Sequence, residues 1–318
     1  GAKVAVSYSP LAHGMDRGIV WQAVYCGGKV GFARSSEYAE LLEDIAEISP
    51  SMFTAMPHFW NRMFADFHSR MFEMAHDLLA SIGATDRAKS EPVARLIASA
   101  AHRGLADAPI AAEIRAAALR ESAPKLGRNM RLIGTGGAHT GDDVIAFLRE
   151  CFSPAEVINS YGATECPGIS SNGVINEAVE VRLVDAPQSG YRTTDKPNPR
   201  GEIVVRSANM ITKYWGNSPA AAEATAAAFK DGWYFTGDIG EINKDTGKLS
   251  IIDRKQNLAE LYVRGRSVWI PISGLESAFS EKCPMVRNLY IHSDRAEGSL
   301  IAVAVPQPGS FADSPDFS

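Results

Sequence analysis

The pattern of hydrophobic and polar positions predicts strands and helices that follow one another through the first half of the chain. Apolar residues recur at helical spacing in some segments, and short apolar runs in others predict buried strands. The predicted strands lie near 2–8, 29–33, 53–56, 130–134 and 157–159, and the predicted helices near 18–26, 37–48, 59–120 (with breaks at 83–86 and 107–109) and 142–151. This alternation predicts an α/β fold with helices around a mostly parallel core sheet.

After about residue 175 the pattern changes to short strands and turns. Strands are predicted at 179–184, 202–206, 248–252, 289–292 and 300–305, with turn sequences at 198–201 and 244–247. This part predicts a β-rich subdomain, followed by a boundary near residues 254–257. The residues from 306 to 318 are rich in Pro and Ser, and we expect them to be poorly ordered.

Composition narrows the function classes. The net charge of −5 argues against a general nucleic-acid binder, which needs a basic face. The four cysteines contain no Cys-x-x-Cys pair, so neither a zinc ribbon nor a thioredoxin-type redox pair is predicted. Four scattered cysteines in a chain of this length are typical of reduced thiols in a cytoplasmic protein. No apolar run is long enough for a membrane span, and no signal segment opens the chain. The chain begins with an alternating pattern typical of a strand already in progress, so we expect it to start inside a larger protein.

The segment Tyr161–Glu165 follows a predicted strand, where ligands sit in parallel sheets. An aromatic ring such as that of Tyr161 can stack on a purine. The hydroxyl of Thr164 can bond a phosphate oxygen, and Glu165 can hold Mg²⁺, a cation that prefers oxygen ligands. The alternative is a polar turn in which Glu165 starts the next segment.

Two further charged positions are candidates. Asp238 follows a Thr-Gly turn and can accept two hydrogen bonds from ribose hydroxyls; alternatively it caps a hairpin turn of its own. Arg254 ends a hydrophobic strand and can clamp ribose or phosphate. The alternative for Arg254 is a solvated linker.

Small residues and one histidine complete the candidates. Gly136, Gly137 and Ala138 follow a predicted strand, and their small side chains let a flat ligand lie against the backbone. This string is neither a Walker loop nor a full dinucleotide fingerprint. His13 can line a pocket or serve a structural role.

The order of these motifs resembles that of adenylate-forming enzymes, the superfamily of acyl-CoA synthetases, firefly-type luciferases and adenylation domains. The resemblance rests on residues 10–13, 136–138, 161–165, 232–238 and 252–255, and it covers the chain to about residue 305. Residues 7–13 are similar to long-chain fatty acyl-CoA synthetases. Similarity to the adenylation domain of carboxylic acid reductases lies at 183–185, 190–191, 194–195 and 199–202.

The resemblance implies a fragment of a two-domain enzyme. Residues 1–256 would be part of the large domain, with an α/β part to about 175 and a β-rich part from about 176 to 256. Residues 257–318 would begin a small, truncated C-terminal domain.

The resemblance also implies roles for the nucleotide loop. Tyr161 would stack on adenine, with Gly162 beside it in the nucleotide site. The glycines and alanine of residues 136–138 would line the adenine and acyl site. Thr164 would bond the α-phosphate, and Glu165 would bind Mg²⁺.

The remaining implied roles concern the ribose and the acid. Asp238 would hold the ribose hydroxyls with help from Arg254, and His13 would lie at the acyl pocket. The enzyme would be an acid–thiol ligase or adenylation domain. It would use ATP and Mg²⁺ to convert a small-molecule carboxylic acid, fatty or aryl, to an acyl-adenylate and pyrophosphate. The thiol of CoA or of the phosphopantetheine arm of a carrier domain would then accept the acyl group.

Several departures from the family pattern leave a second hypothesis open. The family's Ser/Thr/Gly-rich phosphate loop should lie upstream of this chain, and its C-terminal lysine beyond Ser318. Gln256 stands where many relatives carry Asp or Lys, and residues 265–271 lack the pattern of long-chain synthetases. The alternative is a non-catalytic module that keeps the adenylate-forming fold for interaction or structure.

Overall fold

The computed structural model describes residues 3–104, 108–263, 266–283, 286–294 and 299–306. These residues divide into two compact units. The first unit contains the residues up to Gly134 together with Asp142–Val157, and the second contains Thr135–Gly141 and the residues from Ile158 onward. The sequence predicted a domain boundary after residue 256. This boundary does not coincide with the division into two units, and it stays a prediction.

The first unit contains the predicted α/β sheet. Strands β1, β2 and β3 run parallel, with β1 paired to both neighbours, and the strand order continues through β4 to β5. The elements are β1 (Val4–Ser7), α1 (Gly14–Tyr25), β2 (Lys29–Phe32), α2 (Tyr38–Ile48), β3 (Met52–Ala55), β4 (Leu132–Gly136), α6 (Asp142–Cys151) and β5 (Glu156–Tyr161). This arrangement confirms the predicted α/β class. Strands β4 and β5 continue from the first unit into the second.

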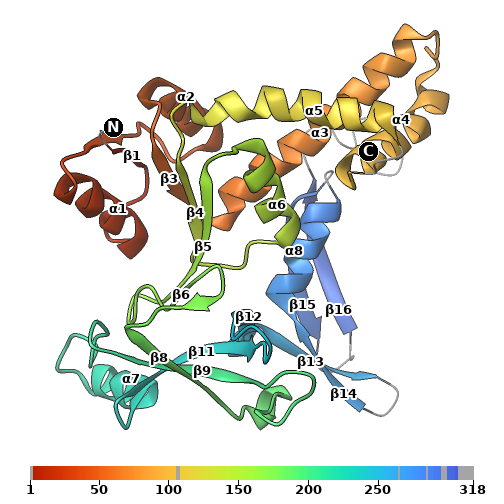
Figure 1. The fold of residues 1–318 in the computed structure, drawn as a ribbon. Coiled ribbons are helices and arrows are strands. Elements are labelled where there is room, and N and C mark those ends of the chain that lie inside the picture. Colours follow the sequence, from red (N-terminus) through yellow and green to blue (C-terminus); the bar gives the residue numbers. More distant parts are fainter. Residues whose placement is uncertain (1–2, 105–107, 264–265, 284–285, 295–298, 307–318) are drawn as a thin grey trace. The chain divides into compact units, whose positions relative to one another are not determined.

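The long helical stretch predicted between β3 and β4 is three helices, labelled in Figure 1: α3 (Pro57–Ser81), α4 (Arg87–His102) and α5 (Pro109–Ser122). Pro57 and Pro109 stand at helix starts, where a missing N–H costs nothing. Buried residues recur every fourth position along α3, at 63, 67, 71, 75 and 79. This stripe packs α3 into the hydrophobic core of the unit. The predicted break at 83–86 is confirmed. Of the second predicted break, at 107–109, residue 107 lies outside the described residues and Pro109 begins α5.

Aromatic rings fix the junction between β3 and α3. Phe53, Phe59 and Trp60 pack with ring centroids 5.0 to 5.6 Å apart, and their faces meet edge-on. The buried Trp60 indole N–H donates to the carbonyl oxygens of Ala55 at 3.1 Å and Gly134 at 3.2 Å. Trp60 therefore joins the end of β3 to β4 without leaving a buried donor unpaired.

The second unit contains the predicted β-rich part. An antiparallel sheet has the order β10-β11-β9-β8, and β12 pairs with β11. Its elements are β8 (Val179–Val184), β9 (Arg200–Ser207), α7 (Pro219–Ala228), β10 (Phe229–Lys230), β11 (Trp233–Ile242) and β12 (Leu249–Arg254), with β6 (Ser170–Ser171) and β7 (Val174–Ile175) following β5. The bounds predicted for β8 are the observed ones.

The structure corrects the turn predicted at Thr236-Gly237-Asp238. These residues lie inside β11, which spans residues 233–242, and the pairing with β9 shifts register between Phe235 and Ile239. Gly237 adopts a φ of 74°, a left-handed conformation that glycine takes at little cost. The Thr-Gly pair therefore makes a β-bulge within a strand rather than a turn between strands.

The chain then continues through a short 3₁₀ turn into further strands and a helix. These are η3 (Lys255–Asn257), β13 (Leu258–Val263), β14 (Arg266–Pro271), α8 (Ile272–Lys282), β15 (Val286–Asp294) and β16 (Ser299–Pro306). The strands predicted at 289–292 and 300–305 lie within β15 and β16. Pro306 ends β16, and the rest of the predicted poorly ordered tail, residues 307–318, lies outside the described residues. Among the described helices, none combines the length and the apolar character that crossing a bilayer requires.

Replacing Trp60 by Ala should reduce the free energy of unfolding by about 3–5 kcal/mol, because it leaves a cavity in a packed core. Trp21→Ala is the matched control, since that indole is 67% exposed on α1 and its loss should change stability by at most about 0.5 kcal/mol. Urea unfolding followed by circular dichroism measures both. Equal losses in the two variants would contradict this description of the core.

Candidate nucleotide site

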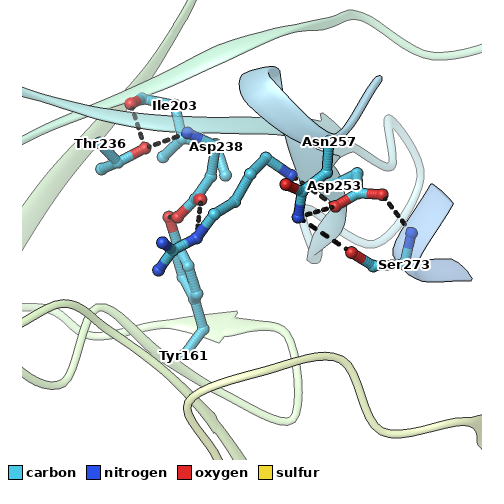
Figure 2. Close-up of polar contacts among 8 residues, drawn as sticks. Tyr161, Ile203, Thr236, Asp238, Asp253, Asn257 and Ser273 are labelled. Atoms are coloured by element: carbon cyan, nitrogen blue, oxygen red, sulfur yellow. Dashed lines mark hydrogen bonds and ion pairs between the residues drawn. The ribbon is translucent and has the colours of Figure 1, made fainter. Parts of the chain in front are cut away.

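Tyr161 is the last residue of β5 and belongs to the second unit, like the strand β11 that its hydroxyl contacts. The hydroxyl donates to Asp238 Oδ2 at 2.7 Å (Figure 2). Burial raises the pKa of Tyr161, and the negative charge of Asp238 raises it further. The phenol therefore stays protonated at neutral pH and acts as the donor. This contact joins two of the residues that the sequence singled out, 77 positions apart.

The bulge in β11 fixes the position of Asp238. Its backbone N–H donates to Thr236 Oγ1 at 3.0 Å, and the Thr236 hydroxyl donates in turn to the carbonyl oxygen of Ile203 at 2.8 Å. Asp238 pairs with Arg254 across β11 and β12, and Arg254 Nε lies 3.6 Å from Asp238 Oδ1. The structure thus brings Tyr161, Asp238 and Arg254 together.

Burial makes the charged form of the Asp238 carboxylate energetically unfavourable. The residue is only 9% exposed, and burial raises its pKa. The hydrogen bond from Tyr161 and the charge of Arg254 act in the opposite direction, but burial outweighs them. A partner that donates more hydrogen bonds to this carboxylate would relieve the cost, and a pair of ribose hydroxyls is such a partner.

A second buried carboxylate lies immediately after this group. Asp253 Oδ1 accepts from the backbone N–H of Arg254 at 2.7 Å, and Oδ2 accepts from the N–H of Ser273 at 2.8 Å (Figure 2). Asn257 Nδ2 donates to Ser273 Oγ at 3.1 Å. Because Ser273 lies in the first turn of α8, Asp253 satisfies one of the helix's unpaired N–H groups. These contacts hold the backbone of Arg254 in place, and the sequence did not single out Asp253, Asn257 or Ser273 as a network.

Glu165 is held by a residue that the sequence did not single out. Tyr214 donates its hydroxyl to Glu165 Oε1 at 2.7 Å. Burial, followed by this hydrogen bond, raises the pKa of Tyr214 to about 12. Among the described residues, no group of three or more Asp, Glu, His or Cys side chains is arranged to hold a metal. A lone carboxylate fits Mg²⁺ that arrives with a nucleotide, because Mg²⁺ keeps water and phosphate oxygens as its other ligands.

The small residues after β4 separate into two groups. Gly136 is buried, and a Cβ there would lie 2.7 Å from the carbonyl oxygen of Ser160, so packing against β5 requires glycine. Gly137 and Ala138 are exposed. The hydroxyls of Thr135 and Thr140 lie 2.7 Å apart and close the loop between them.

The remaining candidates stay predictions. Gly162 is exposed, and a Cβ there would lie 2.8 Å from the N atom of Gly168, so close backbone packing explains this glycine. Thr164 is exposed next to Glu165. His13 precedes α1 in the first unit, exposed, and makes no side-chain capping bond to that helix. Its assignment to an acyl pocket is untested.

A profile of AMP-binding enzymes matches residues 2–215. The chain belongs to the AMP-binding enzyme family. This confirms the resemblance seen in the motifs.

Acyl-CoA synthetases and carboxylic acid reductases are among the relatives of this chain. Long chain acyl-CoA synthetase 7, peroxisomal, from Arabidopsis thaliana is 31% identical over 331 residues, which cover 98% of this chain and 43% of that protein. Carboxylic acid reductase from Mycobacterium marinum is 30% identical over 307 residues, which cover 95% of this chain and 23% of the reductase. The chain thus spans less than half the length of these relatives.

Solved structures show the same likeness. The adenylation domain of a carboxylate reductase from Mycobacterium chelonae has a TM-score of 0.78 at 27% identity, covering 99% of this chain and 44% of that one. The adenylation domain of the Segniliparus rugosus reductase, solved with AMP and a co-purified carboxylic acid, has a TM-score of 0.74 at 25% identity, covering 98% and 43%.

Replacing Asp238 by Asn should change the pH dependence of stability. Because burial raises the pKa of Asp238, its contribution to stability is complete below its ordinary value of about 3.9 and is lost as pH rises through the raised pKa. Asn stays neutral, so the melting temperature of Asp238→Asn, relative to that of the unmodified chain, should increase as pH rises above about 4. Asp245→Asn, in an exposed turn, is the matched control. A gain that shrinks as pH rises would contradict the assigned environment.

Proposed function

We propose that the protein to which this chain belongs activates a carboxylic acid with ATP, forming an acyl-adenylate and pyrophosphate. The observation that carries the proposal is the grouping of Tyr161, Asp238 and Arg254 by a 2.7 Å hydrogen bond and a 3.6 Å ion pair. Membership of the AMP-binding enzyme family supports it. The names of the relatives, acyl-CoA synthetases and carboxylic acid reductases, support a carboxylic acid as the substrate.

In this proposal the described residues bind and orient the nucleotide. The ring of Tyr161 stacks on adenine, and the exposed Gly137 and Ala138 leave room beside it. Asp238 accepts hydrogen bonds from the ribose hydroxyls, with its pair Arg254 alongside. A ribose held in this way fixes the α-phosphorus for attack by the acid, so the rate is gained by positioning.

Thr164 and Glu165 act at the phosphates. The Thr164 hydroxyl bonds the α-phosphate, and Glu165 holds Mg²⁺ from the position that Tyr214 fixes. When bound, Mg²⁺ neutralises the charge that develops as pyrophosphate leaves. His13 lies at the pocket for the acid.

A thiol then attacks the acyl carbonyl of the adenylate, forming a thioester as the acyl–phosphate bond breaks and AMP leaves. Two acceptors are proposed: CoA, which the names of the acyl-CoA synthetases support, or the phosphopantetheine arm of a carrier domain. A solved reductase fragment that joins an adenylation domain to a carrier domain supports the second acceptor. The proposed substrates are fatty or aryl acids, and the proposed location is the cytoplasm.

Replacing Asp238 by Ala should weaken binding of a stable acyl-adenylate analogue, an acylsulfamoyl adenosine, by roughly 10- to 100-fold, because the ribose loses a charged acceptor. Isothermal titration calorimetry on the 318-residue chain measures the dissociation constant. Asp245→Ala, in an exposed turn, should bind as the unmodified chain does. Equal affinity of the Asp238→Ala variant and the unmodified chain would contradict the ribose assignment.

Acid-dependent exchange of pyrophosphate into ATP tests the reaction itself. The full-length protein should catalyse this exchange with at least one fatty or aryl acid. Failure with a panel of such acids, in a protein that still binds the analogue, would favour the non-catalytic alternative.

A further inference from the structure

Glu165 is bonded to a distant segment through both its backbone and its side chain. The Tyr214 hydroxyl donates to Glu165 Oε1 at 2.7 Å, and the backbone N–H of Ile211 donates to the Glu165 carbonyl oxygen at 2.9 Å. The two contacts come from residues three apart, in the stretch between β9 and α7. This stretch therefore fixes both the backbone and the side chain of Glu165.

Tyr214 is itself anchored to the sheet and to α7. Its backbone N–H donates to Thr225 Oγ1 at 3.1 Å, and that hydroxyl donates to the carbonyl oxygen of Ala221 at 2.8 Å. Its ring meets Phe229 edge-on, with centroids 5.7 Å apart, and Phe229 packs on Tyr234 at 5.2 Å. The backbone and the ring of Tyr214 are therefore both fixed, and together they position the hydroxyl that bonds Glu165.

This arrangement leaves the carboxylate able to bind a cation. A carboxylate offers about four acceptor sites on its two oxygens. The Tyr214 hydroxyl uses one of them on Oε1, and the Tyr234 hydroxyl also bonds Glu165, so acceptor sites remain for a cation. A neutral phenol that donates also stabilises the charged form that a hard cation requires. The hydrogen bond restricts the side-chain rotation that metal binding would otherwise have to restrict.

We propose that Tyr214 is a positioning residue that holds the Glu165 carboxylate ready for Mg²⁺ brought by the nucleotide. This inference rests on the proposed function. The hydroxyl acts through Glu165, and the segment from Ile211 to Thr225 is thereby coupled to the metal. The role predicts that loss of the hydroxyl weakens the binding of the metal and leaves nucleotide binding without metal unchanged.

Tyr214→Phe removes the hydroxyl and keeps the ring that packs on Phe229. The probe is the non-hydrolysable analogue α,β-methylene-ATP, titrated calorimetrically into the 318-residue chain with EDTA and at increasing Mg²⁺. In the variant, the Mg²⁺ concentration that gives half the metal-dependent gain in affinity should rise about tenfold, as expected for a lost charge-assisted hydrogen bond. Affinity in EDTA should be unchanged. Tyr25→Phe, where the ring is 93% exposed on α1, is the matched control.

A double-variant cycle separates positioning from a general structural effect. In a Glu165→Gln background, Tyr214→Phe should add no further change in Mg²⁺ dependence. Thr225→Ala, which loosens the backbone anchor of Tyr214, should shift the Mg²⁺ dependence in the same direction by a smaller factor. This third variant carries the test if Tyr214→Phe fails to fold.

Two failures are distinguishable. If the unmodified chain binds the analogue with Mg²⁺ and the Tyr214→Phe variant matches it or binds Mg²⁺ more tightly, the role of Tyr214 is overturned alone. An additive effect in the Glu165→Gln background overturns it as well. If the unmodified chain shows no metal-dependent binding, the proposed function of Glu165 falls together with that of Tyr214.

Discussion

The hydrogen bond from Tyr161 to Asp238 is the contact around which the candidate site is organised. One partner ends β5 and the other occupies the bulge of β11, so a single 2.7 Å contact joins residues from two different sheets. The contact requires a protonated phenol and a carboxylate, and the pKa of Tyr161, raised by burial, supplies the first. The roles proposed at the adenine and the ribose depend on this alignment.

Buried carboxylates recur around this contact, each with a partner. Asp238 has Tyr161 and Arg254, and Asp253 has the backbone at Arg254 and α8. Glu202, 8% exposed on β9, accepts from Lys255 Nζ at 2.9 Å. Such pairs recover the cost of burying charge only in part, so they indicate specific geometry more than stability. The geometry they specify is that of the β12 end, where Arg254 faces Asp238.

The sequence predicted the elements with strong periodicity and missed others, among them β11, α7 and α8. The predicted bounds of α6 and β8 are the observed ones, because α6 has apolar residues at helical spacing and β8 alternates apolar and polar residues. The strand β11 was missed because its Thr-Gly pair is typical of a turn. In the structure, Gly237 instead adopts the left-handed conformation of a β-bulge within the strand. The order of the motifs along the sequence indicated Tyr161, Asp238 and Arg254 as site residues. Only the folded structure shows that they contact one another.

Other parts of the site carry no local signal at all. Tyr214 lies 49 positions from Glu165, and nothing in its neighbours along the chain indicates a carboxylate partner. Gly136 illustrates the opposite case, because its small size suggested a ligand, while the carbonyl oxygen of Ser160 already requires it. Tertiary contacts, not residue types, distinguish these cases.

The most direct test of the central claim is a crystal structure of the chain with an acylsulfamoyl adenosine bound. The account predicts that adenine density lies on the ring of Tyr161 and that both ribose hydroxyls lie within hydrogen-bonding distance of Asp238. A ligand bound elsewhere, with Asp238 contacting no part of the ribose, would contradict it.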